Sequence, residues 1–437
     1  MTAKRRVHLA AHFPGVNNTT IWSDPRAGSQ IDFGSFEHFA QTAERGIFDF
    51  VFLAEGLRVR EHAGRIHDLD VVGRPDSLTV LAGVAAVTER IGLVATLNTT
   101  YNEPYELARQ LLSLDVLSGG RAGWNVVTTN DAFTGANFRR GGYLDTADRY
   151  RRADEFIDIA RSLWADAGTG RTTLRSSDLF DVRARLDTPQ SPQGRPVLLQ
   201  AGVSAEGRDF AARHADAIFS PFATLGPGQE FYEDVKARVT AAGRAPDDLK
   251  ILPGATFVLG DSIQEAEERY REERRAQISG ATALRTLEAV WGRELAEFDP
   301  DGPLPPLDLV VEGAELAEGR ATIHRDTRGI AEAWHARAEA EGLSIRESVI
   351  TKDPRPPFVG TPGDIAERLD EFVQARGSDG FILVPTITPT GLDEFVAKVI
   401  PVLQERGVYP TEYAETTLRS HLETPLPAAS VPAGSLH

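Results

Sequence analysis

Short apolar runs alternate with segments of helical periodicity along most of the chain. Eight runs have the length and composition of buried strands, and helical sequence joins each run to the next. The predicted strands are Arg6–Phe13, Phe48–Glu55, Ile91–Asn98, Gly123–Thr129, Arg195–Gly202, Asp216–Phe222, Lys250–Gly260 and Asp379–Thr386. The predicted helices include Ser35–Gly46, with Ser35 as its N-cap, Thr146–Asp166 and Gly391–Gly407. A polar loop is predicted around Gly168–Gln193, before the fifth strand.

Apolar strands separated by helices imply parallel pairing with both faces of the sheet covered. Eight such units close into a (β/α)8 barrel. The alternative is an open doubly wound sheet, which usually carries the pattern G-x-G-x-x-G after its first strand. Here the first strand is followed by PGVNNTT, so the α/β pattern favours a (β/α)8 TIM barrel with insertions.

The helical periodicity changes character between the seventh and eighth strands. Charged helical sequence covers about residues 261–350 and is interrupted by the proline-rich stretch Asp299–Asp308. We expect residues 1–410 to form a single barrel domain with its largest insertion there. Residues 411–437 are rich in proline, serine and alanine, and we expect them to form an extended C-terminal arm.

Composition excludes several classes of protein. The 437 residues carry a formal net charge of −17, which argues against a nucleic-acid-binding surface. The chain has no cysteine, which excludes disulfides and thiolate metal sites, and we expect no metal. The basic start, MTAKRRVHLAAHFPG, is too short and too broken by histidines for a signal peptide, and no apolar run has membrane-spanning length. We expect a cytoplasmic protein that binds no membrane.

Polar side chains stand near the carboxyl ends of three predicted strands, namely Glu55, Asn98 and Asn125. In a barrel these ends meet at one mouth, where functional residues lie. Asn125 is an amide inside the apolar run WNVVTT, and a buried amide without a partner costs about 1–3 kcal/mol. A structural bond to neighbouring backbone would explain one such residue, whereas three converging at one mouth favour a site.

The turn after the fifth strand, LLQAGVSAEGRD, leads through Gly202 and Ser204 into a helix. Such a turn presents backbone N–H groups, a hydroxyl and the positive end of a helix to an anion. A phosphate is therefore a candidate ligand. The alternative, that Ser204 only caps the helix, stays open.

Five stretches carry a resemblance to a known family. They resemble the flavin-dependent two-component monooxygenases of the bacterial luciferase superfamily, in particular the nitrilotriacetate monooxygenase component A type. The match covers about Arg6–Phe222 densely and Pro362–His421 more loosely, and Asp261–Ser348 lacks it. The stretches are AERGIFDFVFLAEGL (43–57), AAVTERIGLVATLNTTYNEPYELARQLLSLDVLSGGRAGWNVVTT (85–129), RYRRADEFIDIARSLW (149–164), SPQGRPVLLQAGVSAEGRDFAARHADAIF (191–219) and DEFVAKVIPVLQERG (393–407).

The resemblance implies FMNH2 and O2 as cosubstrates and a separate NAD(P)H:FMN reductase as partner. It also implies a homodimer or homotetramer. The chain lacks a nicotinamide fingerprint, which agrees with a separate reductase. The implied cofactor contacts are Ala54, Glu55, Asn98, Thr146, Tyr150, Ala201, Gly202 and Ser204. The family usually has aspartate where Glu55 stands and histidine where Thr146 stands.

His12, Asn125 and Thr146 are the candidate catalytic residues. His12 ends the first strand and could act as an acid or donor at the reactive face, or be a satisfied histidine of the rim. Asn125 would anchor the strand end behind the flavin or touch the substrate. Trp22 and Trp124 would line an aromatic pocket or belong to the core. The glycine-rich loop 130–143 could close over the mouth as a lid.

The predicted reaction is oxygenation or oxidative cleavage of a small organic molecule. The reaction would take place at a C–N bond, at a C–S bond or on an aromatic substrate. Riboflavin is one candidate substrate. Two alternatives stay open, a hydride-transferring oxidoreductase that uses deazaflavin F420 and a non-enzymatic flavin-binding protein. The sequence does not identify the substrate.

Overall fold

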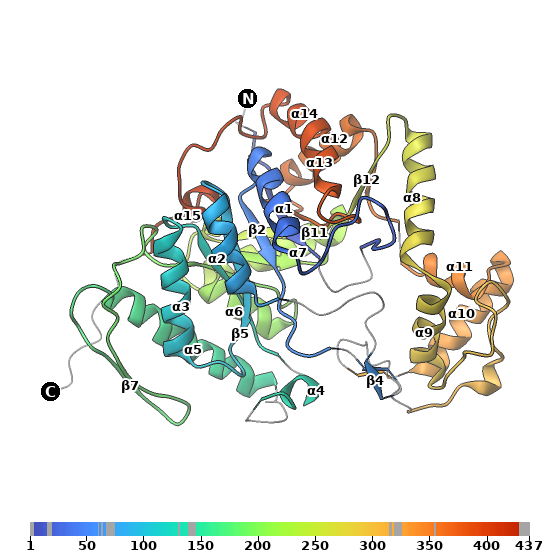
Figure 1. Cartoon of the computed structure of the whole chain (residues 1–437), viewed down its shortest axis with the longest axis horizontal. Coiled ribbons are helices and arrows are strands. Elements are labelled where there is room, and N and C mark those ends of the chain that lie inside the picture. The colour runs from blue at the N-terminus through green and yellow to red at the C-terminus, as the bar shows by residue number, and fades with distance from the viewer. Residues whose placement is uncertain are drawn as a thin grey trace.

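The computed structural model contains a closed barrel of eight parallel strands with helices around it (Figure 1). It describes residues 4–14, 20–59, 61–62, 64–66, 75–129, 132–138, 146–313, 317–318, 326–353 and 355–427. The barrel strands are β1 His8–Phe13, β2 Phe50–Leu53, β5 Gly92–Asn98, β6 Ala122–Val127, β9 Val197–Gln200, β10 Ala217–Ser220, β11 Lys250–Ala255 and β15 Gly380–Leu383. Around the barrel they follow the order β1-β15-β11-β10-β9-β6-β5-β2, so the predicted (β/α)8 fold is confirmed.

Helices cover the outside of this barrel. Between successive strands lie α1 Phe33–Arg45, α2 Ser77–Val87, α3 Pro104–Leu117, α4 Ala132–Gly135, α5 Thr146–Asp166, α6 Ala205–His214, α7 Leu225–Ala241 and α12 Pro362–Gln374. After the last strand come α13 Gly391–Lys398, α14 Ile400–Glu405 and α15 Leu418–His421. No helix of the described ranges combines the length and the apolar character that crossing a membrane requires.

The alternation of side chains along a strand decides which residues reach the barrel interior. On β5, Leu93 and Ala95 belong to the apolar cluster beneath the helices, while Val94 belongs to the interior cluster. Because side chains alternate with a period of two, Thr96 and Asn98 share the interior side with Val94. The same alternation on β1 places His12 on the interior side.

Four local predictions differ from the structure. The helix α1 begins at Phe33 with Asp32 at the N-cap, so Ser35 is not its cap. The predicted strand Lys250–Gly260 divides into β11 and β12 Phe257–Leu259, which leaves the barrel to pair with β14 Phe358–Gly360. The predicted helix Gly391–Gly407 divides into α13 and α14, with a proline in the first turn of α14. The polar loop before β9 contains a hairpin, β7 Thr173–Ser176 and β8 Asp181–Ala184.

The insertion between β11 and β15 is helical, as expected. It contains α8 Ile263–Gln277, α9 Gly280–Trp291, α10 Thr327–Glu341 and α11 Ile345–Ile350, seen at the right of Figure 1. Its helices share their own apolar cluster, in which Trp291 is fully buried. A short sheet joins the insertion to the loop after β2, through β13 Ala317–Glu318, β3 Glu61–His62 and β4 Arg65–Ile66.

The tail up to Pro427 packs against the barrel instead of forming the extended arm that we expected. Leu418 and Leu422 of the α15 segment are fully buried in the interior cluster. A methyl group on Gly92 would lie 2.5 Å from Leu418 Cδ1, and one on Gly123 would lie 3.0 Å from its Cδ2. The α15 segment therefore closes the amino-terminal end of the barrel. Residues 428–437 of the predicted arm lie outside the described residues.

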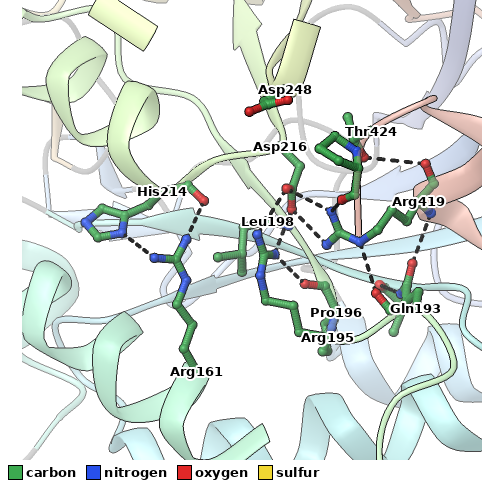
Figure 2. A network of polar contacts seen from close by, with 12 residues as sticks. Arg161, Gln193, Arg195, Pro196, Leu198, His214, Asp216, Asp248, Arg419 and Thr424 are labelled. Atoms are coloured by element: carbon green, nitrogen blue, oxygen red, sulfur yellow. Dashed lines mark hydrogen bonds and ion pairs between the residues drawn. The ribbon is translucent and has the colours of Figure 1, made fainter. Parts of the chain in front are cut away.

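Buried aspartates hold this amino-terminal rim together, and Figure 2 shows the contacts of one of them, Asp216. Asp216, directly before β10, accepts from Arg195 at 2.7 and 3.0 Å, from Arg419 at 3.0 Å and from the Leu198 N–H at 2.8 Å. Burial opposes ionisation of Asp216, but the two arginines outweigh it and hold its pKa well below the usual range. The contact with Arg419 fixes the α15 segment to the barrel.

Buried aspartates with cationic partners also precede two other strands. Asp49, before β2, accepts from Arg6 at 2.8 Å and from the Leu9 N–H at 3.1 Å. Asp379, before β15, accepts from Lys236 at 3.0 Å and from the Ile251 N–H at 2.8 Å. Each carboxylate thus satisfies an N–H of a neighbouring strand, and charged partners offset the cost of its burial.

Candidate active site

The opposite, carboxyl rim of the barrel collects the residues that the sequence singled out. Neighbouring strands β2, β5, β6 and β9 all point their carboxyl ends to this rim. Glu55 follows β2, Asn98 ends β5, Asn125 lies on β6, and Ser204 follows β9. These four candidate residues therefore all lie at the carboxyl rim of the barrel, and none lies at the amino-terminal rim.

Glu55 and Asn98 contact each other. Asn98 is fully buried, and its Nδ2 donates to both carboxylate oxygens of Glu55, at 3.2 and 3.1 Å. Its Oδ1 accepts from the Tyr101 N–H at 2.7 Å. The amide of Asn98 is thereby held in one orientation, while the half-buried Glu55 presents a negative charge at the mouth.

Asn125 lies one strand further around the barrel and is 3% exposed. Its Nδ2 donates to Thr96 Oγ1 at 3.0 Å, so its bond is to a side chain of β5 and not to backbone. Its Oδ1 is buried and has no hydrogen-bond partner within the described ranges. Since leaving a buried acceptor unpaired costs free energy, this oxygen indicates a donor supplied by a ligand or water.

Tyr150, Gly202 and Ser204 meet at the start of α6. Ser204 is the N-cap of α6, and its Oγ accepts from the Gly207 N–H at 3.1 Å. A methyl group on either Gly202 or Gly207 would lie 2.9 Å from the Tyr150 hydroxyl. The two glycines therefore let the turn, the first turn of α6 and the phenol oxygen pack closely together, at the positive end of a ten-residue helix.

Gln200 and Gly207 complete this turn, and the sequence did not single out either of them. The Oε1 of Gln200, the last residue of β9, accepts from the Gly202 N–H at 2.6 Å. The glycine spacing G-V-S-A-E-G was the available signal, because it matches a tight turn followed by a close contact in the first helical turn. Ala54 and Ala201 lie at the same rim and are half-buried.

His12 faces the barrel interior near the end of β1. Its Nδ1 lies 3.0 Å from the carbonyl oxygen of Phe52, and the two rings are 4.8 Å apart between centroids. Because a carbonyl only accepts, Nδ1 carries the proton of the neutral ring. Nε2 is then the atom at which His12 would gain or lose a proton.

The remaining candidates either lie away from the rim or are only partly described. Thr146 begins α5, but its side chain lies outside the described residues. Trp124 is fully buried under the helices beside Phe156, so it belongs to the core and does not line the mouth. Of the predicted lid loop, residues 132–138 are described. They contain α4, and the ring of Phe138 stacks on Tyr101 with centroids 4.5 Å apart.

The loop after β2 also contacts the insertion. His62 Nε2 lies 2.6 Å from Glu288 Oε2 of α9, and both side chains are buried. Asn137 Nδ2, from the lid segment, donates to the Leu57 carbonyl at 3.1 Å. The loop that carries Glu55 is therefore braced from two sides. Within the described ranges, the side chains form no cluster suited to hold a metal ion.

Comparisons with known proteins give one consistent result. The sequence profile of the family described as luciferase-like monooxygenase matches residues 15–379. N-acetyl-S-(2-succino)cysteine monooxygenase of Bacillus subtilis (strain 168) is 35% identical, over 98% of this chain and 99% of its own. Nitrilotriacetate monooxygenase component A of Aminobacter aminovorans is 36% identical, over 94% and 93%.

Solved structures agree with these sequence matches. A riboflavin lyase, solved with modified FMN and riboflavin, superposes with a TM-score of 0.76 at 28% identity, covering 96% of each chain. EDTA monooxygenase from Chelativorans sp. BNC1 superposes with a TM-score of 0.74 at 27% identity, covering 96% of this chain and 99% of its own.

Proposed function

Since the chain belongs to the luciferase-like monooxygenase family, we propose that its carboxyl rim holds FMN and that it uses FMNH2 and O2 to oxygenate or cleave a small organic molecule. A separate NAD(P)H:FMN reductase supplies the reduced flavin. The working form is a homodimer or homotetramer. The observation that supports this proposal most strongly is the turn at the start of α6, which lies at the same carboxyl rim as the Glu55–Asn98 pair.

The start of α6 fits the phosphate of FMN. The N-terminal turn of α6, the Ser204 hydroxyl and the Tyr150 hydroxyl lie around the close contact between Gly202 and Gly207. A side chain at either glycine would collide with this contact and with the Tyr150 hydroxyl, and would therefore displace the turn. The positive end of the α6 dipole adds attraction for a dianion.

The remaining rim residues fit the isoalloxazine ring. Asn125 Oδ1 is a buried acceptor in need of a donor, and the ring carries N–H groups at its polar edge. The Glu55–Asn98 pair offers further acceptors and donors at the next strands. Glu55 is one methylene longer than the aspartate usual in the family, and its carboxylate accepts from Asn98.

Bound reduced FMN supplies the electrons that activate O2 for oxygen transfer. The chain itself orients the flavin through the α6 turn and the three rim residues. The stacking of Phe138 on Tyr101, which follows β5, supports a lid role for this segment, and we expect it to exclude water from the reacting atoms. His12 holds or donates a proton at Nε2 on the β1 side.

Flavin titration tests the phosphate assignment. We expect Ser204→Ala to raise the Kd of FMN by about 5- to 100-fold, on the scale of a lost bond to a charged group. Ser262→Ala is the matched control, because Ser262 caps α8 through the Glu265 N–H and lies away from the carboxyl ends of β2 to β9. Both variants lose an N-cap, so only Ser204→Ala should weaken FMN. Equal FMN affinity in the two variants would remove the phosphate from this turn.

A reaction assay tests the oxygen chemistry. FMNH2 from any reductase and 18O2 would be supplied with candidate substrates, and product mass would be measured. We expect one heavy oxygen in the product. Hydride transfer from reduced F420 with no oxygen incorporated would replace this proposal with the alternative activity.

A further inference from the structure

Three hydrogen-bond donors lie buried at the β1–β15 side of the carboxyl rim. Thr20 is 5% exposed and Thr388 is fully buried, and neither hydroxyl has a hydrogen-bond partner in the described ranges. The indole Nε1 of Trp22 is likewise buried and without a described partner. None of these groups belongs to the flavin contacts proposed above.

The three donors belong to two loops that are bonded to each other. β1 and β15 are adjacent parallel strands, so the loops that follow them leave the same sector of the rim. The Ile21 N–H donates to the Thr386 carbonyl at 2.7 Å, and the Gly28 N–H donates to the Thr388 carbonyl at 2.8 Å. His12, at the end of β1, lies in this sector as well.

The outer side of these loops lines a different cavity. That cavity, of about 650 Å³, is lined by Ile21, Ser23, Thr386 and Ile387 together with residues of α8. Thr20, Trp22 and Thr388 are absent from its lining, although Thr20 and Trp22 alternate with the lining residues Ile21 and Ser23, and Thr388 directly follows Ile387. The donors therefore do not serve the outer cavity.

Buried donors without acceptors are rare, because each loses its bonds to water on folding. Three of them in one sector indicate a missing acceptor. We propose that Thr20, Trp22 and Thr388 form a donor subsite for an oxygen atom of the substrate, in a carboxylate, sulfonyl or carbonyl group. This inference rests on the proposed function, because it assigns the substrate class of the same mouth.

Unfolding experiments separate this role from a structural one. A hydroxyl that bonds nothing in the protein adds no stability, so Thr20→Val and Thr388→Val should keep or raise the melting temperature of the full chain without substrate. Thr42→Val is the matched control, since the buried Thr42 hydroxyl donates to Asp393 at 2.7 Å. We expect Thr42→Val to lower the melting temperature. A comparable loss in the Thr20 and Thr388 variants would show an internal partner and overturn the subsite.

Kinetics then test the substrate class with named probes. Nitrilotriacetate, dibenzothiophene sulfone and riboflavin present carboxylate, sulfonyl and carbonyl oxygens, and hexadecane presents none. With FMNH2 supplied, we expect turnover of at least one of the first three and none of hexadecane. For the compound that is turned over, Thr20→Val, Trp22→Phe and Thr388→Val should each raise KM about five- to tenfold. The Kd of FMN should stay within about twofold, as expected for residues outside the flavin contacts.

The outcomes are distinct. Unchanged KM in all three variants, turnover of hexadecane, or no turnover of any oxygen-bearing probe by enzyme that binds FMN would overturn the donor subsite. Failure of the unmodified enzyme to bind FMN would instead contradict the proposed function.

Discussion

At the amino-terminal rim, Asp216 and Asp379 each accept from two cationic side chains and from a strand N–H. At the carboxyl rim, Asn125 Oδ1 and the hydroxyls of Thr20 and Thr388 are buried and lack partners within the described residues. Both rims close the same eight strands, so the barrel does not require this difference. The paired rim holds the strands and the tail together, and the unpaired rim keeps bonding capacity for a ligand.

The division is not complete, because Arg6 Nε, Ser378 Oγ and His421 Nδ1 at the amino-terminal end are also buried and lack partners within the described residues. Asp115 is a further exception. It lies in the last turns of α3 at the amino-terminal end and is fully buried. Its Oδ1 accepts from the Ala122 N–H at 3.0 Å and from Gln193 at 2.6 Å, but no hydrogen bond from a described residue reaches Oδ2. Burial raises its pKa to about 6. Pairing with a cation, and not the rim itself, therefore decides whether a buried carboxylate stabilises the fold.

The largest expected effect breaks the paired rim. Asp216→Ala leaves the buried Arg419 and the largely buried Arg195 without their counter-charge. We expect the free energy of unfolding, measured by urea titration, to fall by about 3–5 kcal/mol. Asp178→Ala is the control, because Asp178 makes an exposed ion pair with Arg151 and its loss should not change the midpoint measurably. Equal midpoints for the two variants would contradict the role of the paired rim.

The second prediction concerns Asp115, the buried aspartate that lacks a cationic hydrogen-bond partner. Its folded-state pKa of about 6 lies above the ordinary value of 3.8, so the folded protein holds this proton to higher pH than the unfolded chain. The contribution of Asp115 to stability therefore decreases as pH rises from about 4 to 6, by about 3 kcal/mol in total.

The Asp115→Asn variant should not lose this stability as pH rises, because an amide does not ionise. Its oxygen can still accept from the Ala122 N–H and from Gln193. Urea titrations from pH 4.5 to 8 should show the variant gaining on the unmodified protein as pH rises, with a difference of about 3 kcal/mol above pH 7. The lowered pKa values of Asp49, Asp216 and Asp379 act in both proteins and cancel. Parallel stability curves would contradict the prediction.

The smallest expected effect on stability belongs to the unpaired rim. Glu55→Gln keeps the length of the side chain and one acceptor for Asn98. We expect the free energy of unfolding to change by less than about 1 kcal/mol, while the Kd of FMN rises. Thermal unfolding and flavin fluorescence measure the two quantities on the same sample. A large loss of stability with unchanged flavin affinity would place Glu55 among the structural residues.

Much of this architecture follows from sequence pattern. The positions of all eight strands were predicted, because continuous apolar runs between helices are typical of buried parallel strands. The position of Asn98, Asn125 and Ser204 at one rim followed from the same pattern. The family, the enzyme class and a flavin-dependent monooxygenase activity were indicated by the resemblance, and the comparisons confirm them. The individual roles of the site residues stay predictions.

Other features depend on contacts that no local pattern reveals. Asp216 and Arg419 are 203 positions apart, and only the closed barrel brings them together. The proline, serine and alanine content of the tail suggested an extended arm, yet Leu418 and Leu422 are spaced four residues apart, as on one face of a helix. The three unpaired donors were not foreseen as a group, because burial without a partner is visible only in three dimensions.

The α15 segment has a consequence for how the polypeptide is made. Leu418 and Leu422 fill the floor of a barrel whose first strand is made some four hundred residues earlier. During synthesis the base of the barrel therefore stays open to water until Leu418 and Leu422 have left the ribosome. A barrel halted before this point would expose its hollow base, which is the state that chaperones would encounter.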